Sequence, residues 1–419
     1  MKKSAAKAIS ITIKKKNRDY LIRSPMYNKI HHSMEKLRGY CEREQFKGWD
    51  PYDGLNSLIF RYSPLKLSRF IRLAWIQFFK QNPFNLRPLF LVKKGYNSKG
   101  LALFLSSYCN FYKIDPSEKY LKIIGFLADK LLESKTKGFS GDCWGYNFDW
   151  QSRLEFMPKN TPTTVVTSFA AYGLMDAYEC TKNKKYLHSA LGSCNFIIND
   201  INRSNKEKGF IFSYSPLDKM RVYNASLLGS RMLARAYSYN GNEKILDIAR
   251  ESIIACVAAQ REDGSWLFGE DKAQNWVDSF HTGYKLESIS EYQKYSGDTT
   301  FDENIKKGTN FYLNNFFLKD GTPKYYDKEI YPIDIHCPAQ FVAALSRLNI
   351  FFENIDLIEK VLSWTIKNMQ DIKRGYFYYQ IKKYKSSKIP YIRWGQAWML
   401  YGMSFYLLEK RKNGKNFGS

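Results

Sequence analysis

A glycine turn that recurs along the chain constrains the possible fold more than any other sequence feature. In each copy the glycine is followed closely by an aromatic residue or a turn, then by an aromatic polar loop and an apolar helix. The copies begin at Gly138, Gly209, Gly264, Gly321 and Gly375, at intervals of 71, 55, 57 and 54 residues. A period of this length is typical of stacked helical pairs.

The helix after each loop is rich in small and apolar residues, and each except the last is followed by a second helix with charges on one face. A single helical pair cannot bury its own apolar face, so neighbouring pairs must stack. The sequence shows no polar capping repeat of the kind that an open solenoid needs, so six pairs should close into an all-α (α/α)6 toroid. We expect the inner helices at 98–112, 163–178, 224–237, 279–292, 336–348 and 394–408.

Three segments follow from this pattern. We expect a basic N-terminal helical extension over 1–94 that packs on the barrel, the barrel itself over 95–412, and a flexible tail over 413–419. A helix within 26–48 is also available to pair with the last inner helix. Residues 1–100 carry 22 basic and 6 acidic residues, a net +16 of the total +25.

The excess of positive charge near the N-terminus indicates an anionic partner. Zinc fingers, RNP-like runs and a helix-turn-helix pattern are missing from the sequence, so we do not expect nucleic acid. The amphipathic stretch 65–80 places Arg69, Arg72 and Lys80 among apolar residues that include Trp75. Such a helix could lie on the surface of an anionic membrane as a peripheral contact, or it could pack on the body of the protein.

Other features narrow the class of protein further. The apolar run near the N-terminus is short and lacks a cleavage-like end, and no apolar stretch approaches the roughly 18 residues of a membrane span. Seven scattered cysteines without a CxxC pair favour a reducing compartment, so we expect a cytoplasmic protein without metal. The sequence also gives no sign of a cofactor.

Two histidines occupy equivalent places in successive copies of the repeat. His281 and His336 are 55 residues apart, and each follows an aspartate, Asp278 or Asp334. Because every loop precedes an inner helix, all loops should meet at one rim. A neutral imidazole oriented by a carboxylate is a good general base or acid. The alternative is that each aspartate only caps the next helix.

The rim also offers groups for other chemistry. Asp142 or Asp149 could act with Asp278 or Asp334 in glycoside hydrolysis, which needs two carboxyl groups. A histidine with Tyr284 could instead abstract a proton beside a uronate carboxylate that Arg221 or Arg393 holds. Aromatic and polar residues suited to sugars, or else to plugging the barrel, are Trp144, Asn147, Trp150, Arg221, Tyr223, Asn224, Trp266, Trp276, Tyr326, Gln340, Arg393, Trp394 and Gln396.

Five motifs in the chain carry a resemblance to known proteins: Asp50-Pro-Tyr-Asp53, Asn82-Pro-Phe-Asn-Leu-Arg87, Asn224-Ala-Ser226, Trp276-Val-Asp-Ser-Phe-His-Thr-Gly283 and Asp334-Ile-His-Cys-Pro-Ala-Gln340. With the helical repeat, the chain resembles the six-hairpin glycosidase-like superfamily over about residues 30–410. Within it, the motifs are similar to those of uncharacterised bacterial and archaeal proteins encoded with capsule, exopolysaccharide or O-antigen genes. Some of these proteins carry an aminolevulinate dehydratase label, which does not fit because that enzyme is a β/α barrel and no βα repeat is present.

The resemblance implies a carbohydrate-active enzyme of polysaccharide biosynthesis that acts on an oligosaccharide or polysaccharide, acidic or lipid-linked. Glycoside hydrolysis is our first expectation, with uronosyl 5-epimerisation or lyase chemistry as the alternative. A glycan-binding scaffold protein without catalysis is a further alternative. Its mark would be tight binding without turnover.

Overall fold

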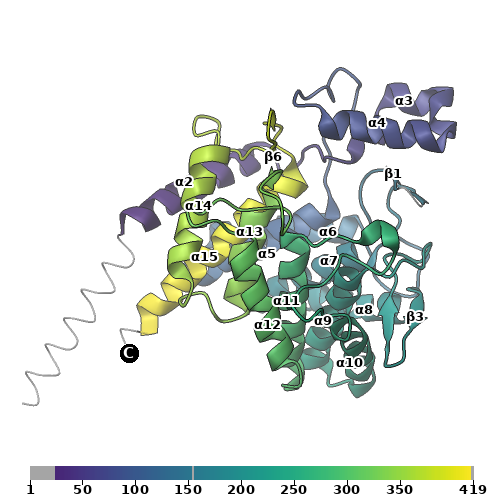
Figure 1. Ribbon diagram of the computed structural model, residues 1–419, viewed down its shortest axis with the longest axis vertical. Helices are drawn as coiled ribbons and strands as arrows, with labels where there is room; N and C mark the ends of the chain where they lie inside the picture. The colour runs from purple at the N-terminus through teal and green to yellow at the C-terminus, as the bar shows by residue number, and fades with distance from the viewer. Residues whose placement is uncertain (1–23, 153–154, 417–419) are drawn as a thin grey trace, which may run out of the picture.

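Six inner helices form a closed ring in the computed structural model, which describes residues 24–152 and 155–416 (Figure 1). Each inner helix packs on the next, and the first packs on both the second and the last, so the ring is closed. The prediction of an all-α (α/α)6 toroid is therefore confirmed. The inner helices are α5 (Ser98–Ile114), α7 (Thr164–Thr181), α9 (Tyr223–Asn240), α11 (Ser279–Ser296), α13 (His336–Arg347) and α15 (Trp398–Asn416).

An outer helix accompanies each inner one. The sixth outer helix is α2 (Pro25–Arg43), which packs on α14 and α15 although it comes first in the chain. Ser33 on α2 donates to Gln370, just after α14, at 2.6 Å. The ring therefore begins at Pro25, ahead of the boundary expected at residue 95. The other outer helices are α6 (Glu118–Glu133), α8 (Lys184–Asn199), α10 (Glu243–Val257), α12 (Asp302–Asn315) and α14 (Ile355–Met369).

The recurring glycines have a common structural reason. Gly264 has a φ of +89°, and a Cβ built there would lie 2.4 Å from the backbone oxygen of Lys307 on α12. Gly375 has a φ of +92° and approaches the backbone oxygen of Lys36 on α2 in the same way. Side chains rarely adopt this left-handed backbone, and none fits in this space. At four of the five copies the turn glycine thus lets the loop touch the next outer helix, whereas at Gly138 a Cβ would meet nothing within 4 Å.

The inner helices, expected to be rich in small and apolar residues, also carry buried charged side chains. Buried ion pairs join neighbouring helices in the middle of the ring, with Arg235 on α9 2.8 Å from Asp176 on α7. Arg347 on α13 lies 2.9 Å from Glu287 and 2.8 Å from Glu291, both on α11. Buried charges are tolerated when they are paired in this way.

Short strands order the loops at the rim. β1 (Trp150–Gln151) pairs with β2 (Phe156–Met157), and β3 (Arg203–Asn205) pairs with β4 (Phe210–Phe212), both antiparallel. β5 (Ile333–Asp334), β6 (Gln380–Ile381) and β7 (Ser386–Ser387) form a three-stranded sheet that joins the loops before α13 and α15. A π-helical turn, η4 (Ile392–Ala397), leads into α15.

Residues 53–91 form an arm that stands off the ring at the rim, at the upper right of Figure 1. Trp75 is packed by the rings of Phe60 and Phe90 at 5.0 and 5.2 Å, and its Nε1 donates to the Gly54 oxygen. The buried Arg87 guanidinium pairs with Asp53 at 2.5 Å. The arm comprises η1 (Asp53–Asn56), α3 (Leu58–Tyr62), η2 (Pro64–Leu67), α4 (Arg69–Gln81) and the segment that returns to the ring.

The C-terminal helix is longer than expected. The last helix runs to Asn416, into the segment expected to be a flexible tail. The basic start at residues 1–20 and the final residues 417–419 lie outside the described residues. All seven cysteines are free thiols. Among the helices that the structure describes, none has both the length and the apolar character to cross a lipid bilayer.

Candidate functional site

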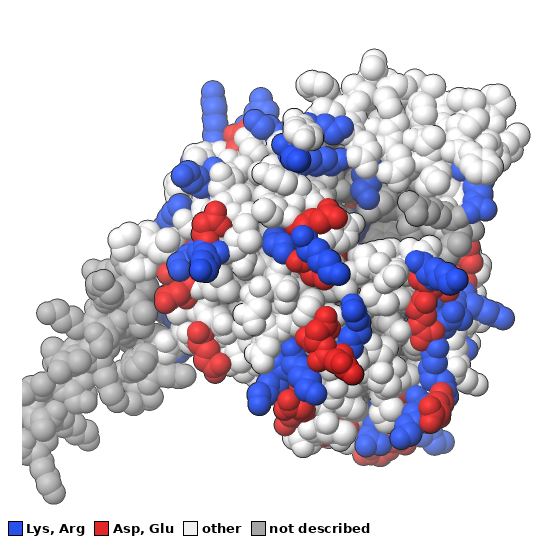
Figure 2. Space-filling model, in the orientation of Figure 1, with Lys and Arg blue, Asp and Glu red and all other residues white. Residues whose placement is uncertain are grey.

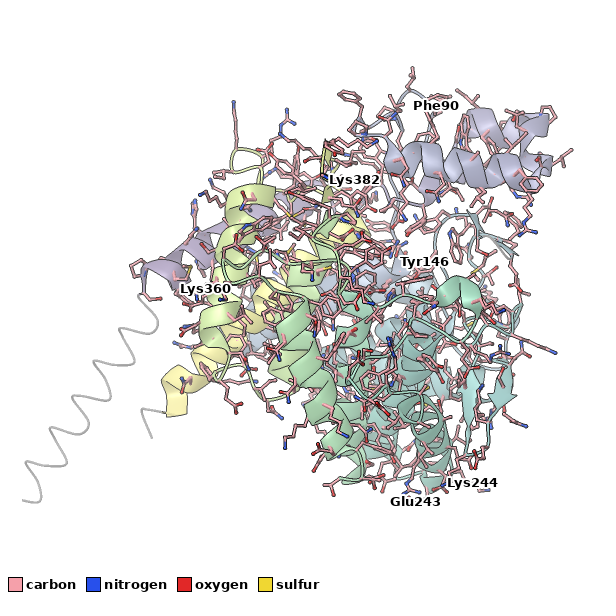
Figure 3. The ribbon with its side chains drawn as sticks, in the orientation of Figure 1. Phe90, Tyr146, Glu243, Lys244, Lys360 and Lys382 are labelled. Carbon is pink, nitrogen blue, oxygen red and sulfur yellow. The ribbon has the colours of Figure 1, made fainter. Side chains whose placement is uncertain are left out.

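The loops before the inner helices meet at the arm side of the ring. Figure 3 shows Tyr146 between the arm residue Phe90 above it and Glu243 and Lys244 at the opposite end of the ring. Asp278, His281 and Asp334 are brought together here from two loops, with the buried His336 at the start of α13 beside them. The Phe280 ring lies 4.1 Å from that of His281 and 4.3 Å from that of His336. The two histidines therefore share one site.

Asp278 both caps α11 and holds His281. One carboxylate oxygen accepts from the backbone N–H of His281 at 3.0 Å, and the other lies 2.7 Å from His281 Nδ1. Trp276 Nε1 donates to the second oxygen at 2.9 Å. Asp278 therefore does both things considered from the sequence: it caps the next helix, and it contacts the imidazole of His281. Because Nδ1 donates to the carboxylate, Nε2 of His281 keeps its lone pair.

The surroundings of His281 and Asp278 favour a neutral imidazole beside an ionised carboxylate, which is the arrangement that a general base needs. Burial lowers the pKa of His281 below its usual value, although the Asp278 carboxylate opposes this shift. Burial alone would raise the pKa of Asp278, but the His281 imidazole and the hydrogen bonds hold it below the usual value. The His281 side chain is 17% exposed, whereas that of Asp278 is fully buried. A neutral, partly exposed imidazole faces the rim with a carboxylate behind it.

A second chain of polar groups lies beside His281. Lys99 Nζ donates to the Tyr284 hydroxyl at 3.2 Å, and this hydroxyl lies 2.7 Å from His336 Nε2. Burial and the Arg393 charge lower the pKa of Lys99 well below its usual value. Burial and the Lys99 charge do the same to the pKa of His336. The imidazole of His336 is therefore neutral at neutral pH.

The hydrogen-bond partners of Lys99, Tyr284 and His336 determine where the protons of these side chains lie. Since Tyr284 accepts from Lys99, its own proton is directed to Nε2 of His336, and the ring proton of His336 is on Nδ1. Within the described part of the chain, this buried Nδ1 has no hydrogen-bond partner. An unpaired buried donor costs about 1–3 kcal/mol, so such groups are concentrated where a ligand or a proton is handled.

Asp334, like Asp278, is held by three hydrogen bonds. It accepts from the backbone of His336, from Trp394 Nε1 and from Gln380 Nε2, at 3.0, 2.8 and 2.9 Å. Burial raises its pKa to about 6 despite these bonds. The side chain is fully buried, so it orients the start of α13 rather than facing the rim.

Aromatic rings surround these groups. Trp398, fully buried, lies 5.5 Å from Tyr284 and 4.3 Å from His336, between ring centroids. Toward the rim, the half-buried Tyr52 ring lies 5.7 Å from Trp394 and 6.4 Å from Trp150. Partly exposed aromatic faces with polar neighbours are a surface on which a sugar ring can stack.

The two arginines expected to hold a uronate carboxylate are already paired. Arg393 is buried and makes two hydrogen bonds to Asp50, at 2.6 and 2.8 Å. Arg221 lies 2.6 Å from Glu270 and 3.1 Å from Asp271. Within the described part of the site, two buried lysines near the histidines have no carboxylate partner. Lys99 donates to Tyr284, and Lys285 on α11 donates to the backbone oxygens of Trp266 and Leu267.

Several predicted sugar-binding residues have structural roles instead. The Trp144 and Trp266 side chains are fully buried, and each donates its Nε1 to a backbone oxygen near the end of the preceding outer helix, at 2.7 and 3.1 Å. Gln396 is also buried and bridges both backbone groups of Phe377 at 2.8 Å. An aromatic residue after the turn glycine therefore fills the space between helices, which explains its recurrence.

Asp142 lies away from the histidines. It accepts from Lys135 on the outer wall at 3.0 Å and contacts Ser189 on α8. Together with His188 and neighbouring lysines it lines an outer surface hollow of about 800 Å³. Asp149 stays in the rim loop and accepts from the backbone of Lys159 at 2.7 Å.

The remaining candidates lie near the rim or deeper in the ring. Asn147 accepts from Asn97 at 2.7 Å, and Tyr326 pairs with the backbone of Asp278. Asn224 and Gln340 are buried, and each has a side-chain oxygen without a partner among the described residues. Tyr223 begins α9 and is mostly buried.

Sequence reasoning missed Lys99 and Asp50 as parts of the site. Lys99 is the single charged residue in the first turns of α5, where its neighbours in Ser98-Lys-Gly-Leu-Ala-Leu103 are all uncharged. A lone charge in a helix that must be buried is a signal that could have identified it. Asp50 offered no such signal because its partner is 343 residues away. Across the described residues, no group of three or more His, Cys, Asp or Glu side chains is arranged to hold a metal ion.

Comparison with known proteins extends the fold assignment. No protein-family model and no curated protein matches the chain. A cellobiose 2-epimerase from Bacillus thermoamylovorans is 13% identical, with a TM-score of 0.60 over 76% of this chain and 90% of that one. An unsaturated glucuronyl hydrolase specific for heparin is 13% identical, with 0.59 over 92% and 97%. An α-mannanase from Bacteroides thetaiotaomicron is also 13% identical, with 0.57 over 75% and 86%. The chain thus has the six-hairpin glycosidase-like fold of these structures.

Proposed function

We propose that this protein is a carbohydrate-active enzyme that moves a proton at a carbon of a sugar, beside a carbonyl or carboxylate group. The expected reaction is epimerisation or isomerisation without cleavage of the glycosidic bond. The observation that carries the proposal is the His281 imidazole. Its Nδ1 is fixed by a buried carboxylate, and its Nε2 faces the rim with a free lone pair.

Each step of such a reaction has a candidate group. His281 Nε2 takes the proton, and Asp278 stabilises the imidazolium that forms. Negative charge then develops on the sugar oxygen next to the carbanion, where nearby donors lower the barrier. Lys99 is the donor beside His281, because its Nζ carries N–H groups beyond the one that bonds the Tyr284 hydroxyl. The Tyr284 ring lies 5.8 Å from that of His281. His336, behind Tyr284, is the second acid–base group.

The geometry favours this chemistry over glycoside hydrolysis, our first expectation from the sequence. Hydrolysis needs two carboxyl groups that flank a scissile bond. Asp142 lies on the outer wall, and the side chains of Asp278 and Asp334 are fully buried. Hydrolysis remains the second candidate, because Asp149 stays in the rim loop and solved hydrolases share the fold.

The test is proton exchange with solvent. Aldoses, N-acylhexosamines and uronate oligosaccharides are incubated with the protein in D2O, and deuterium at carbon is followed by NMR and mass spectrometry. We expect deuterium in one sugar together with a change of configuration or carbonyl position. His281→Gln should abolish the exchange. His188→Gln, on the exposed face of α8, is the matched control and should not.

Other outcomes would assign a different function. New reducing ends without deuterium would indicate hydrolysis, and an unsaturated uronate that absorbs in the ultraviolet would indicate a lyase. Tight glycan binding with neither product, unchanged in Asp278→Asn, would indicate a scaffold protein. The sequence resemblance to proteins encoded with surface-polysaccharide genes makes glycans of that kind, free or lipid-linked, the first substrates to include.

A further inference from the structure

The arm formed by residues 53–91 exposes far more apolar surface than the rest of the chain. Half of the large apolar side chains that are exposed in the described residues come from this short segment. Tyr62, Leu67, Phe70, Phe84 and Leu89 are each more than 70% exposed. In Figure 2 the visible face of this lobe is almost entirely uncharged. Apolar patches of this kind usually mark a surface that another body covers.

Helix α4 shows that this exposure is built into the arm. Its inward side buries Ile76 and Phe79 against the rest of the arm. Its outward side carries Phe70, Ala74 and Phe78, which are spaced by four residues and exposed. Residues at this spacing lie on one face of a helix. The helix is therefore apolar on two sides, and only one of them is covered by the protein.

The charges of the arm specify the partner. Residues 54–114 contain no aspartate or glutamate. Arg61, Lys66 and Arg69 are exposed and form no ion pair with any described residue. Exposed apolar groups beside unpaired cations match a bilayer surface that presents anionic headgroups above acyl chains. A second copy of the same arm would bring like charges together, which opposes self-association.

We propose that the arm docks this protein on an anionic membrane surface, with Leu67 and Phe70 inserted and Lys66 and Arg69 on the lipid headgroups. Docking also orients the candidate site. Arg72 on α4 donates to Gln151 in the rim loop at 2.9 Å, and Lys80 donates to Tyr52 at 3.0 Å. The rim therefore lies beside the membrane, where a lipid-linked or surface-bound glycan would be presented.

Vesicle flotation of the full-length protein tests the docking. We expect binding to vesicles of phosphatidylcholine mixed with phosphatidylglycerol, and little binding to phosphatidylcholine alone. Raising salt from 0.1 to 1 M, which shortens the Debye length from about 10 to about 3 Å, should release the protein. Each basic residue at an anionic surface contributes about fivefold to binding. Lys66→Glu/Arg69→Glu should thus bind at least about 25-fold more weakly than Lys244→Glu/Lys360→Glu, a distant pair with the same charge change.

The contribution of the exposed apolar side chains to membrane binding is tested with a separate double variant and its control. Leu67→Ser/Phe70→Ser should bind at least about tenfold more weakly than wild type, because two apolar side chains no longer leave water. Phe352→Ser, in the α13–α14 connection, is the control. All substituted side chains are exposed, and deuterium exchange into a soluble sugar reports separately on the candidate site.

Three results would overturn the proposal. One is equal binding to neutral and anionic vesicles. Another is equal binding by the arm variants and their controls. The third is a dimer in light scattering that Leu67→Ser/Phe70→Ser dissociates while no vesicle is bound, which would assign the surface to a second copy of the chain.

Discussion

Replacement of the turn glycine Gly264 by alanine tests why the repeat needs glycine. The matched control is Gly297→Ala, at the end of α11. Both glycines have a left-handed backbone, with φ of +89° and +76°. This conformation costs an alanine about 1–2 kcal/mol at either position. The gain from a stiffer unfolded chain, about 0.4–1 kcal/mol, is also common to both.

The two positions differ in the space around the new methyl group. At Gly297 a Cβ would meet nothing within 4 Å, whereas at Gly264 it would lie 2.4 Å from the backbone oxygen of Lys307. A helix backbone cannot turn away as a side chain can, and overpacking of this kind costs about 1–3 kcal/mol. We therefore expect Gly264→Ala to lose about 1–3 kcal/mol more free energy of unfolding than Gly297→Ala.

Urea unfolding followed by circular dichroism measures this difference, with the slope of each curve compared to confirm a similar transition. Equal losses in the two variants would refute the reasoning. The turn glycine would then be required only for its backbone angle, and the close approach to the outer helix would carry no energetic weight.

Four further predictions concern the site and its supports. The pKa of His281 lies below its usual 6.5, so the imidazole is neutral above that pH; the deuterium-exchange rate should be constant there and fall only below it. Asp278→Asn removes the charge that raises this pKa, so the rate should drop and its acidic limb should move to still lower pH. Lys99→Met should leave the unfolding free energy equal or higher, since it removes a buried amine whose charged form is disfavoured by burial, yet lower the exchange rate at least about tenfold. Asp50→Ala leaves Arg393 unpaired and buried and should cost about 3–5 kcal/mol in urea unfolding. Glu44→Ala, which breaks a partly exposed pair with Lys94, should cost less than about 1 kcal/mol.

The sequence by itself determined the architecture of this protein. A glycine turn at intervals of 54 to 71 residues leaves few alternatives, because each helical pair must bury its apolar face against the next. The same periodicity placed His281 and His336 at equivalent points of successive pairs, and the structure brings both to one site. Residues at the same place in successive repeats lie at the same end of neighbouring inner helices, so they come close together in the folded ring.

Tertiary structure alone decided which side chains are available. Trp144 and Trp266 share a pattern with the rim aromatics, but both are buried and donate to backbone oxygens near the end of the preceding outer helix. Arg393 is neutralised by Asp50, 343 residues away, and no local pattern encodes that distance. Lys99 approaches Tyr284 only because the ring closes across α5 and α11. Pairing and burial are properties of the closed ring, whereas its period is a property of the chain.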